Sequence, residues 1–270
     1  MSCPCGVILY DKPPGITSHD VVARVRRALG RGVKVGHAGT LDPFATGLLL
    51  VLVGRATRVQ RFLMALPKRY EAIARFGAVS STADPEGEIV HTGRLPAGEL
   101  ALPVGRIRQR PPAFSAVKLA GRRAYQLARA GHVDLELPER EVEVHRFQEL
   151  WRQGERRGFL VECSSGTYVR SLIAGLGDAY CESLRRTAIG PFHLTAADPE
   201  RIVPLDEALA FLPELRLDPQ AARRAVHGAV VPGRSAGTVR LTDEAGLIAL
   251  GEPDERAGGI RPVVGLRSEG

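Results

Sequence analysis

The stretch GHAGTLDPFATG, residues 36–47, contains the residue types of this sequence that are best suited to catalysis. It places one carboxylate, Asp42, between a leucine and a proline, and its glycines let the backbone approach a ligand closely or adopt positive φ. An ionised aspartate in such a loop can act as a nucleophile or as a base, and His37 adds a hydrogen-bonding ring nearby. An Asp-Pro pair is also a common start for a turn or a helix. The loop by itself leaves both interpretations open.

Two distant segments offer side chains that would complete a site around Asp42. Tyr70, in KRYEA at the start of a predicted strand, is either a core aromatic or a face on which a base could stack. Tyr168 and Arg170 are two residues apart in SSGTYVRSL, so they point the same way if that segment is extended. An arginine beside a carboxylate lowers its pKa and keeps it ionised. Arg170 is equally compatible with the surface, and the residues alone do not pair it with Asp42.

Common cofactor and metal motifs are absent from the sequence. It has no G-x-x-x-x-G-K-[ST], no G-x-G-x-x-G between a strand and a helix, and no G-x-S-x-G. The four cysteines lack the spacing of a zinc site and are too few for a disulfide framework. We therefore expect chemistry by side chains alone, with no cofactor, no metal and reduced thiols.

Basic residues are concentrated in two windows that contain no acid, residues 43–70 and 100–133. The whole chain has 37 Lys and Arg against 30 Asp and Glu, a net charge of +7. One run of like charge is usually solvated surface, but two such windows favour a polyanion such as nucleic acid. The windows contain Arg55, Arg58, Arg61, Lys68, Arg69, Arg106, Arg108, Arg110, Lys118, Arg122, Arg123 and Arg129.

Hydrophobic patterning predicts an α+β protein with a small appended unit. Strands are expected over residues 6–10, 48–53 and 68–76, and a capped helix from Thr17 or Ser18 to about residue 29, without a regular βαβ rhythm. The longest apolar run is too short to span a bilayer, and no export signal is visible, which favours a cytoplasmic protein. A shift in composition near residue 215 is followed by enough chain for a small β-barrel.

Several motifs occur in an order that resembles the bacterial tRNA pseudouridine synthase B (TruB) family as far as about residue 215. The tail resembles that family's small PUA-type RNA-binding module. The motifs that carry the resemblance are VILYDKPPGITSHDVV, VGHAGTLDPFATGLL, KRYEA, QRPPAFSAVKLAGRRAYQLARAG, SSGTYVRSL and LRRTAIGPF.

This resemblance implies a fold, a division into domains and an activity. The fold is a pseudouridine synthase fold with a central mixed, mostly antiparallel sheet flanked by helices, over residues 1–215, with an RNA-clamping insertion at about 101–132. A PUA-like β-barrel module follows at 216–270. The activity is isomerisation of the T-loop uridine at tRNA position 55 without cofactor or metal. The partner is the tRNA T-arm stem-loop. Since the chain starts close to its first motif, we expect a monomer without an obligate protein partner.

The resemblance also implies roles for individual residues. Asp42 matches the catalytic aspartate, Arg170 the arginine paired with it, and Tyr70 the tyrosine stacked on the target base. The further substrate-binding residues that it implies are His37, Tyr168, Leu184, Lys12, Lys68 and Arg69, and the clamp residues are Arg110, Lys118, Arg122 and Arg123.

The mechanism remains open at this stage between attack of Asp42 on the sugar, attack on the base and a glycal intermediate. A glycosidase is disfavoured because most glycosidases place two carboxylates around the scissile bond. The alternative from another class is a tRNA-binding or tRNA-folding protein whose isomerase activity is incidental or lost.

Overall fold

The computed structural model describes residues 4–112, 118–119, 122–123 and 138–267. The chain opens with β1 (Gly6–Lys12), α1 (Ser18–Leu29), β2 (Val35–Ala38) and β3 (Thr46–Val53). Helix α1 begins at a capping box, in which Thr17 and Asp20 satisfy each other's main-chain N–H groups. Strand β3 is apolar and buried along nearly its whole length, as expected for a strand covered on both faces.

The remaining elements follow in chain order. They are η1 (Gly54–Val59), α2 (Gln60–Ala65), β4 (Lys68–Phe76), β5 (Ala78–Ser80), β6 (Ile89–His91), β7 (Gly105–Gln109), β8 (Lys118–Leu119), β9 (Arg122–Arg123), β10 (Arg140–Gln153), β11 (Arg156–Cys163), α4 (Val169–Ala174), β12 (Ala179–Ile189), β13 (Phe192–His193), η2 (Leu194–Ala196), β14 (Asp198–Val203), α5 (Leu205–Ala208), β15 (Glu214–Arg216), α6 (Pro219–Val226), β16 (Val239–Asp243), β17 (Gly246–Asp254) and β18 (Gly259–Gly265).

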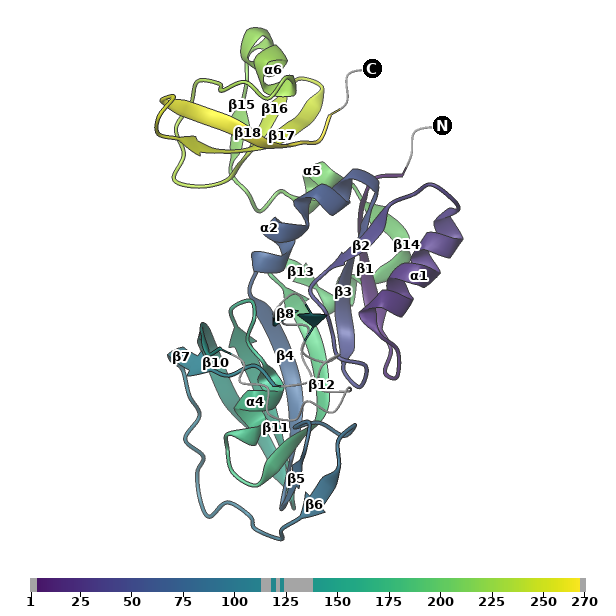
Figure 1. Ribbon diagram of the computed structural model, residues 1–270, viewed down its shortest axis with the longest axis vertical. Coiled ribbons are helices and arrows are strands. Elements are labelled where there is room, and N and C mark those ends of the chain that lie inside the picture. Colours follow the sequence, from purple (N-terminus) through teal and green to yellow (C-terminus); the bar gives the residue numbers. More distant parts are fainter. Residues whose placement is uncertain (1–3, 113–117, 120–121, 124–137, 268–270) are drawn as a thin grey trace.

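A central sheet runs through the long body of the molecule in the order β14-β1-β3-β12-β4-β11-β10-β7 (Figure 1). Strand β2 is added on β3, and β13 on β12. Within the described residues every pairing in this sheet is antiparallel except the contact between β3 and β12. The expected mixed, mostly antiparallel sheet is therefore confirmed. The short parallel contact places the start of β3, directly after the Asp42 loop, against the centre of the sheet.

In strand β4 the pleat directs successive side chains of the KRYEA motif to opposite faces of the sheet. Its residues alternate between buried and more exposed, so Lys68 and Tyr70 face the core while Arg69 faces outward. Tyr70 packs in a hydrophobic cluster that also contains Leu41, Val169 and Leu184. The Asp42 loop and helix α4 thus pack together with Tyr70 of β4 in one cluster.

The C-terminal strands form a separate four-stranded sheet in the order β15-β16-β17-β18, with α6 packed on it. Over the described residues this order is open, in place of the closed barrel expected from the sequence. Strand β15 starts at Glu214, so it straddles the expected boundary at residue 215. The unit sits at the α2 and α5 end of the body (Figure 1), where Leu250 and Leu266 join the main core and Arg61 pairs with Glu252 at 2.8 Å.

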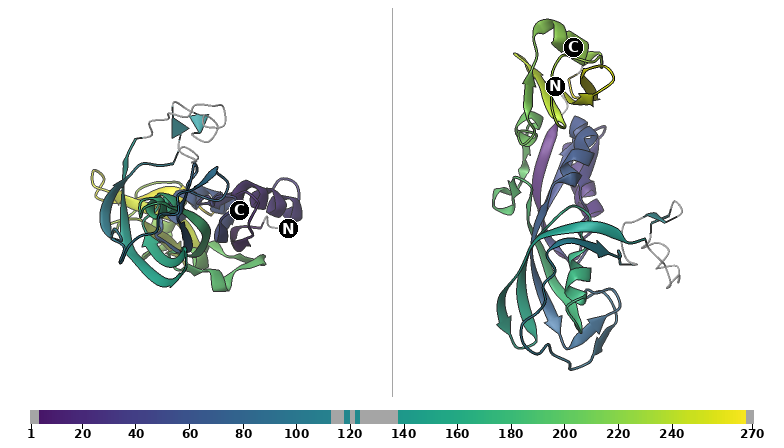
Figure 2. Two further views of the ribbon diagram at one scale, coloured as in Figure 1. Left: turned by 90° about the horizontal axis from the view of Figure 1, so that it is seen from below. Right: turned by 90° about the vertical axis from the view of Figure 1, so that its left-hand side faces the viewer.

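The segment expected to clamp RNA, residues 101–132, is described at 101–112, 118–119 and 122–123. Strand β7 is an edge strand of the central sheet and belongs to this segment. The small β8–β9 pair that follows lies apart from the body (Figure 2). Arg110 is exposed, and Lys118, Arg122 and Arg123 lie on β8 and β9. In the described part of the chain no helix is both long and apolar enough to cross a membrane.

Candidate active site

The loop that carries Asp42, residues 39–45, is held from both sides by the segment between β1 and α1. Ser18 Oγ accepts from the Leu41 N–H at 2.9 Å and donates to the Leu41 carbonyl at 3.2 Å. On the other side the Pro43 carbonyl accepts from Lys12 Nζ at 3.1 Å and from the Gly15 N–H at 2.9 Å. The backbone of Asp42 is therefore fixed, while its side chain remains 33% exposed.

Arg170 joins Asp42 to a second carboxylate. Its Nε lies 2.9 Å from Asp42 Oδ2, and its Nη1 lies 2.5 Å from Asp84 Oδ2 and 3.0 Å from the Thr82 carbonyl. The side chains of Arg170 and Asp84 are each only 3% exposed. The guanidinium thus bridges one buried carboxylate and one that faces solvent.

A tight turn between β5 and β6 presents Asp84. The Asp84 carboxylate also accepts from the Glu86 N–H at 3.0 Å and from Thr82 Oγ1 at 2.5 Å. Ala83 has φ of +60° and is the only residue other than glycine with positive φ among the described residues. Its carbonyl accepts from the Cys181 N–H of β12 at 3.0 Å. A left-handed alanine is sterically unfavourable, so the surrounding contacts hold this turn in place.

The charges around Asp42 oppose one another. Burial raises the pKa of the Asp42 carboxyl, the positive charge of Arg170 lowers that pKa, and the negative charge of Asp84 raises it again. The net direction is upward, which differs from the sequence-based expectation that the arginine would lower the pKa. The difference arises because one cation is shared between two carboxylates in a desolvated site.

Tyr70 and Leu184 form the apolar side of the site. Tyr70 is 8% exposed and Leu184 is 6% exposed, and both belong to the cluster that includes Leu41 of the Asp42 loop. Burial raises the pKa of the Tyr70 hydroxyl, so Tyr70 is neutral over the physiological range. The structure therefore brings together Asp42, Arg170, Tyr70 and Leu184.

Lys12 and Lys68 are in the interior, although the sequence analysis assigned them to substrate. Lys12 is fully buried, and its ammonium donates to the carbonyls of Pro13, Ile16 and Pro43. Lys68 donates to the carbonyls of Met64 and Leu66. Burial lowers the pKa of each to about 8. These contacts give both lysines a role in holding the loops around the site.

The other predicted residues lie around these groups. Arg69 faces outward and pairs with Glu162 at 3.3 Å. His37 is half-buried on β2, and its carbonyl accepts from Gln60 Nε2 at 2.7 Å. Tyr168 caps α4, and its main-chain N–H and carbonyl bond to the Gln109 side chain at 2.8 and 2.9 Å. Arg170 lies in the first turn of this helix, so the segment is not extended, and the condition under which Tyr168 and Arg170 would point the same way is not met.

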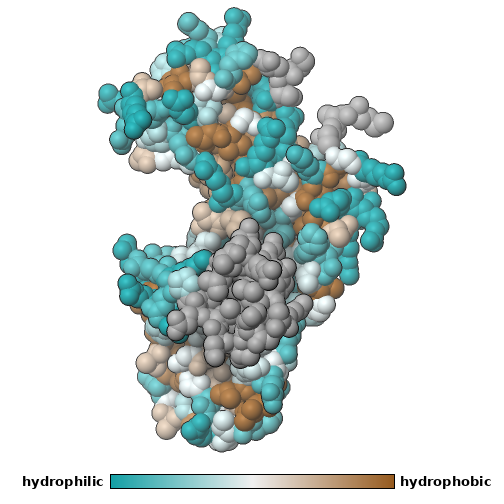
Figure 3. All heavy atoms as spheres, viewed as in Figure 1, coloured by the Kyte–Doolittle hydropathy of each residue, from teal (hydrophilic) through white to brown (hydrophobic). Residues whose placement is uncertain are grey.

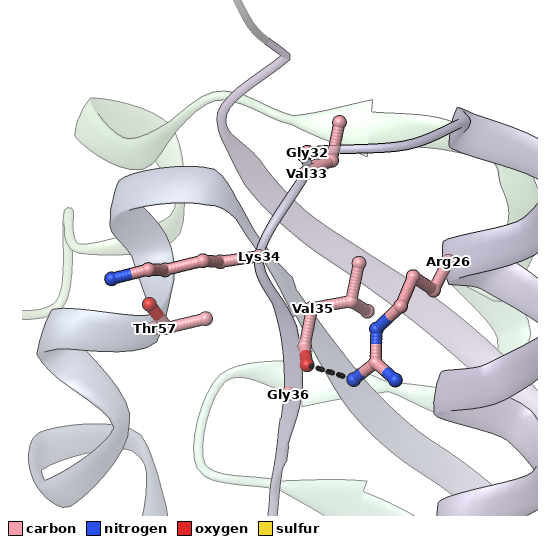
Figure 4. A pocket seen from close by; sticks show the side chains of 7 residues that line it. All are labelled: Arg26, Gly32, Val33, Lys34, Val35, Gly36 and Thr57. Atoms are coloured by element: carbon pink, nitrogen blue, oxygen red, sulfur yellow. Dashed lines mark hydrogen bonds between the residues drawn. The ribbon is translucent and has the colours of Figure 1, made fainter.

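A hollow in the described surface lies away from Asp42, between the end of α1, the start of β2 and η1 (Figure 4). It has a volume of about 500 Å³. Arg26 and Lys34 supply its two cations, and Arg26 is held there by a 3.1 Å hydrogen bond to the Val35 carbonyl. The hollow shares no residue with the cluster around Asp42, so it is a separate basic surface.

Comparison with known proteins places this arrangement in a family. The model of the N-terminal domain of TruB family pseudouridylate synthases matches residues 26–169. The tRNA pseudouridine synthase B of Thermobifida fusca is 44% identical, over 96% of this chain and 97% of that protein. The enzyme of the same name from Nocardia farcinica is 44% identical, over 87% and 80%. The chain belongs to the TruB family of pseudouridylate synthases.

Solved structures agree with the family assignment and confirm a pseudouridine synthase fold. A chain in the crystal structure of a Cbf5–Nop10–Gar1 complex matches 97% of this TruB-family protein and 84% of its own length, with 28% identity and a TM-score of 0.70. A chain of an H/ACA RNP bound to a substrate RNA containing 2′-deoxyuridine matches with 25% identity, coverage of 97% and 85%, and a TM-score of 0.71.

Asp84 is the member of this TruB-family site that sequence reasoning missed. The stretch STADPEG contains the turn-forming pairs Asp-Pro and Glu-Gly, which predict an acidic loop. The one available signal was that Asp84, like Asp42, precedes a proline. That signal does not separate a surface turn from a buried carboxylate, because burial depends on where β12 and α4 lie.

Proposed function

We propose that this protein is a tRNA pseudouridine synthase that isomerises the T-loop uridine at tRNA position 55, with Asp42 as its catalytic residue. The observation that carries the proposal is the chain of ion pairs Asp42–Arg170–Asp84, set beside Tyr70. A carboxylate that is fixed in its backbone, oriented by a buried arginine and still partly exposed is suited to act on a bound nucleotide. The substrate class follows the names of the curated relatives.

The chemistry requires the target nucleotide to leave the RNA stack. Flipping a base costs a few kcal/mol, and stacking on Tyr70 with phosphate contacts elsewhere offsets this cost. Ionised Asp42 can then attack C1′, add to the uracil ring, or remove a sugar proton to give a glycal. Each route releases the uracil from its C1′–N1 bond and reattaches it through C5, so substrate and product are isomers. Each route also begins with the ionised carboxylate.

The neighbouring residues support this step in different ways. Arg170 orients Asp42 and balances its charge, Leu184 forms the pocket wall, and Lys12 and Lys68 hold the surrounding loops. We assign His37, Tyr168 and Arg69 to the surface that receives the displaced RNA loop. We propose that the protein acts as a monomer without an obligate protein partner. We place this activity in the cytoplasm, with the tRNA pool.

The RNA surface that we propose extends along two basic regions. Arg106, Arg108 and Arg110 lead from β7 towards the clamp, and Arg26 and Lys34 line the hollow beside η1. Hydrophilic side chains cover the face around β7 and β10 and the face around α1 (Figure 3). We propose residues 1–215 as the catalytic domain and 216–270 as a PUA-like module that binds RNA. This C-terminal unit contacts the body at the α2 end, through Leu250 and Leu266 in the main core and the Arg61–Glu252 pair.

Mapping pseudouridine in RNA after incubation with the purified protein tests the proposal. A full tRNA and an isolated T-arm stem-loop labelled with 5-³H-uridine are expected to release one tritium per molecule, with pseudouridine at the T-loop position only. Tight binding of tRNA without tritium release would reject the enzyme and favour the binding protein. That alternative is not favoured, because simple binding does not require a buried carboxylate–arginine–carboxylate chain.

Charge reversal on β7 is expected to weaken tRNA binding. The double variant Arg106→Glu, Arg108→Glu removes exposed cations next to the clamp, and each lost phosphate contact makes the slope of log K against log salt shallower by about 0.9. The measurement is a binding titration at several salt concentrations. The matched control is the double variant Arg152→Glu, Arg156→Glu. Strand β7 pairs with the start of β10, whereas Arg152 and Arg156 lie where β10 ends and β11 begins. Equal slopes for the test variant and wild type would remove β7 from the RNA surface.

A further inference from the structure

Arg186 is a second buried arginine beside the site, and neither the sequence analysis nor the proposed chemistry uses it. It lies on β12 and is 1% exposed. In the central sheet it is opposite Gly47 of β3 on one side and opposite Tyr70 of β4 on the other. Its backbone therefore connects the end of the Asp42 loop to the strand that carries the proposed stacking tyrosine.

The guanidinium of Arg186 bonds to both ends of the Asp42 loop. Nη2 donates to the Gly39 carbonyl at 3.0 Å, Nη1 to the Thr40 carbonyl at 3.5 Å, and Nε to the Leu48 carbonyl at 2.7 Å. Its positive charge also favours the ionised form of the Tyr70 hydroxyl, against the larger effect of burial. The side chain thus ties both ends of the segment around Asp42 to β12, the strand next to Tyr70.

The glycines of the loop fit around this arginine. Gly47 has φ of +100°, and a Cβ there would lie 2.3 Å from the Arg186 carbonyl. Gly39 has φ of +93°, and its Cβ position is 3.6 Å from Arg186 Nη1. A side chain at Gly47 would push β3 away from β12 and open the loop. The close approach of β12 explains the glycine at position 47, and the positive φ explains the glycine at position 39.

Arg186 has no ion pair within 4.0 Å among the described residues. An arginine stays protonated under all physiological conditions, and a buried cation is unfavourable unless its N–H groups are satisfied. Here main-chain carbonyls accept from its N–H groups, while Arg170 pairs with the two carboxylates. A core position filled only for stability would be better served by an apolar residue of similar volume.

We propose that Arg186 is a positioning residue for the reaction, which holds the Asp42 loop closed around its guanidinium, beside the strand that carries Tyr70. This inference rests on the proposed function. Displacing a reacting group by about 1 Å can lower a rate about 10²-fold. Arg186 donates to main-chain carbonyls and lies outside the two proposed basic regions, so tRNA affinity is expected to change little when it is replaced.

Two substitutions test the role in the full-length protein. Arg186→Gln is expected to lower single-turnover kcat about 100-fold or more, with KM within about threefold of wild type. Arg186→Lys keeps the charge but cannot reach all of the carbonyls, so a smaller loss is expected. Rates are expressed per folded molecule, from circular dichroism and urea titration. The acid limb of the pH–rate profile is expected to move to higher pH in Arg186→Gln, because the nearby cation favours ionised Asp42.

Arg157→Gln is the matched control. Arg157 is also a buried arginine on the central sheet, but it contacts Glu149, the Pro96 carbonyl and the Phe76 ring rather than the Asp42 loop. It is expected to lose stability while keeping kcat and the pH profile. The inference would be overturned if folded Arg186→Gln had the same kcat and the same pH–rate profile as wild type. Failure of both Arg186 variants to fold would assign Arg186 to folding alone and overturn it too. An inactive wild type would instead reject the proposed function.

Discussion

Replacing Asp42 with asparagine is expected to lower the rate of pseudouridine formation by about 10⁴-fold or more, as losses of essential nucleophiles do. The same change is expected to leave the fold at least as stable as wild type near neutral pH. Arg170 keeps its ion pair with Asp84 in this variant, so the substitution strands no buried charge. Tritium release from 5-³H-uridine RNA measures the rate, and thermal unfolding measures the stability.

The expected stability follows from the pKa of Asp42. Burial raises this pKa above the value of an unfolded aspartate. A raised pKa contributes stability below the unfolded value, and that contribution is lost as the pH rises through the folded pKa. At neutral pH the ionised carboxylate is therefore unfavourable to folding, and asparagine removes this cost.

The pH dependence gives an independent check on Asp42. In wild type the acid limb of the single-turnover rate is expected above the ordinary aspartate pKa. The stability difference between Asp42→Asn and wild type is expected to shrink as the pH falls, because wild-type Asp42 then becomes protonated. A variant that unfolds several degrees lower at neutral pH would show that the Asp42–Arg170 pair stabilises the fold. If Asp42→Asn formed pseudouridine at the same rate as wild type, Asp42 would have no part in the mechanism.

Replacing Arg170 with methionine is expected to abolish turnover and to reduce the free energy of unfolding by about 3–5 kcal/mol. The substitution removes the cation between two carboxylates, and Asp84 is then left buried without its counter-charge. Urea unfolding measures the stability. The control is Arg201→Met, which breaks the exposed pair with Glu207 and is expected to cost about 1 kcal/mol or less. A loss below 1 kcal/mol in Arg170→Met would show that Asp84 is accommodated without the pair.

A second substitution separates stability from catalysis in this pair. Adding Asp84→Leu to Arg170→Met removes the uncompensated carboxylate, so part of the lost stability is expected to return. Turnover is expected to stay abolished, since Asp42 still lacks the group that orients it. Recovery of turnover together with stability would mean that Arg170 acts through the fold alone.

Local sequence patterns were sufficient for several parts of this protein. The capping box at Thr17, the alternation along β4 and the continuous apolar run of β3 depend on neighbours within a few residues. For the same reason the inward direction of Tyr70 follows from the pleat. Glycines and a proline made Asp42 a candidate, but the loop by itself left a simple turn and a reactive carboxylate both open, and only the distant KRYEA and SSGTYVRSL segments favoured catalysis.

Only the tertiary structure decided how the charges are paired. Asp42, Asp84 and Arg170 are separated by dozens of residues and meet because β12 and α4 bring the β5–β6 turn beside the Asp42 loop. Lys12, Lys68 and Arg186 illustrate the same limit. A basic side chain in sequence is most often a surface group, yet these three are buried and bound to main-chain carbonyls. The sequence by itself therefore determined which side chains are candidates for the proposed chemistry and the local shape of their segments. Desolvation and long-range contacts, which exist only in the folded chain, decided which charges face each other and in what protonation state.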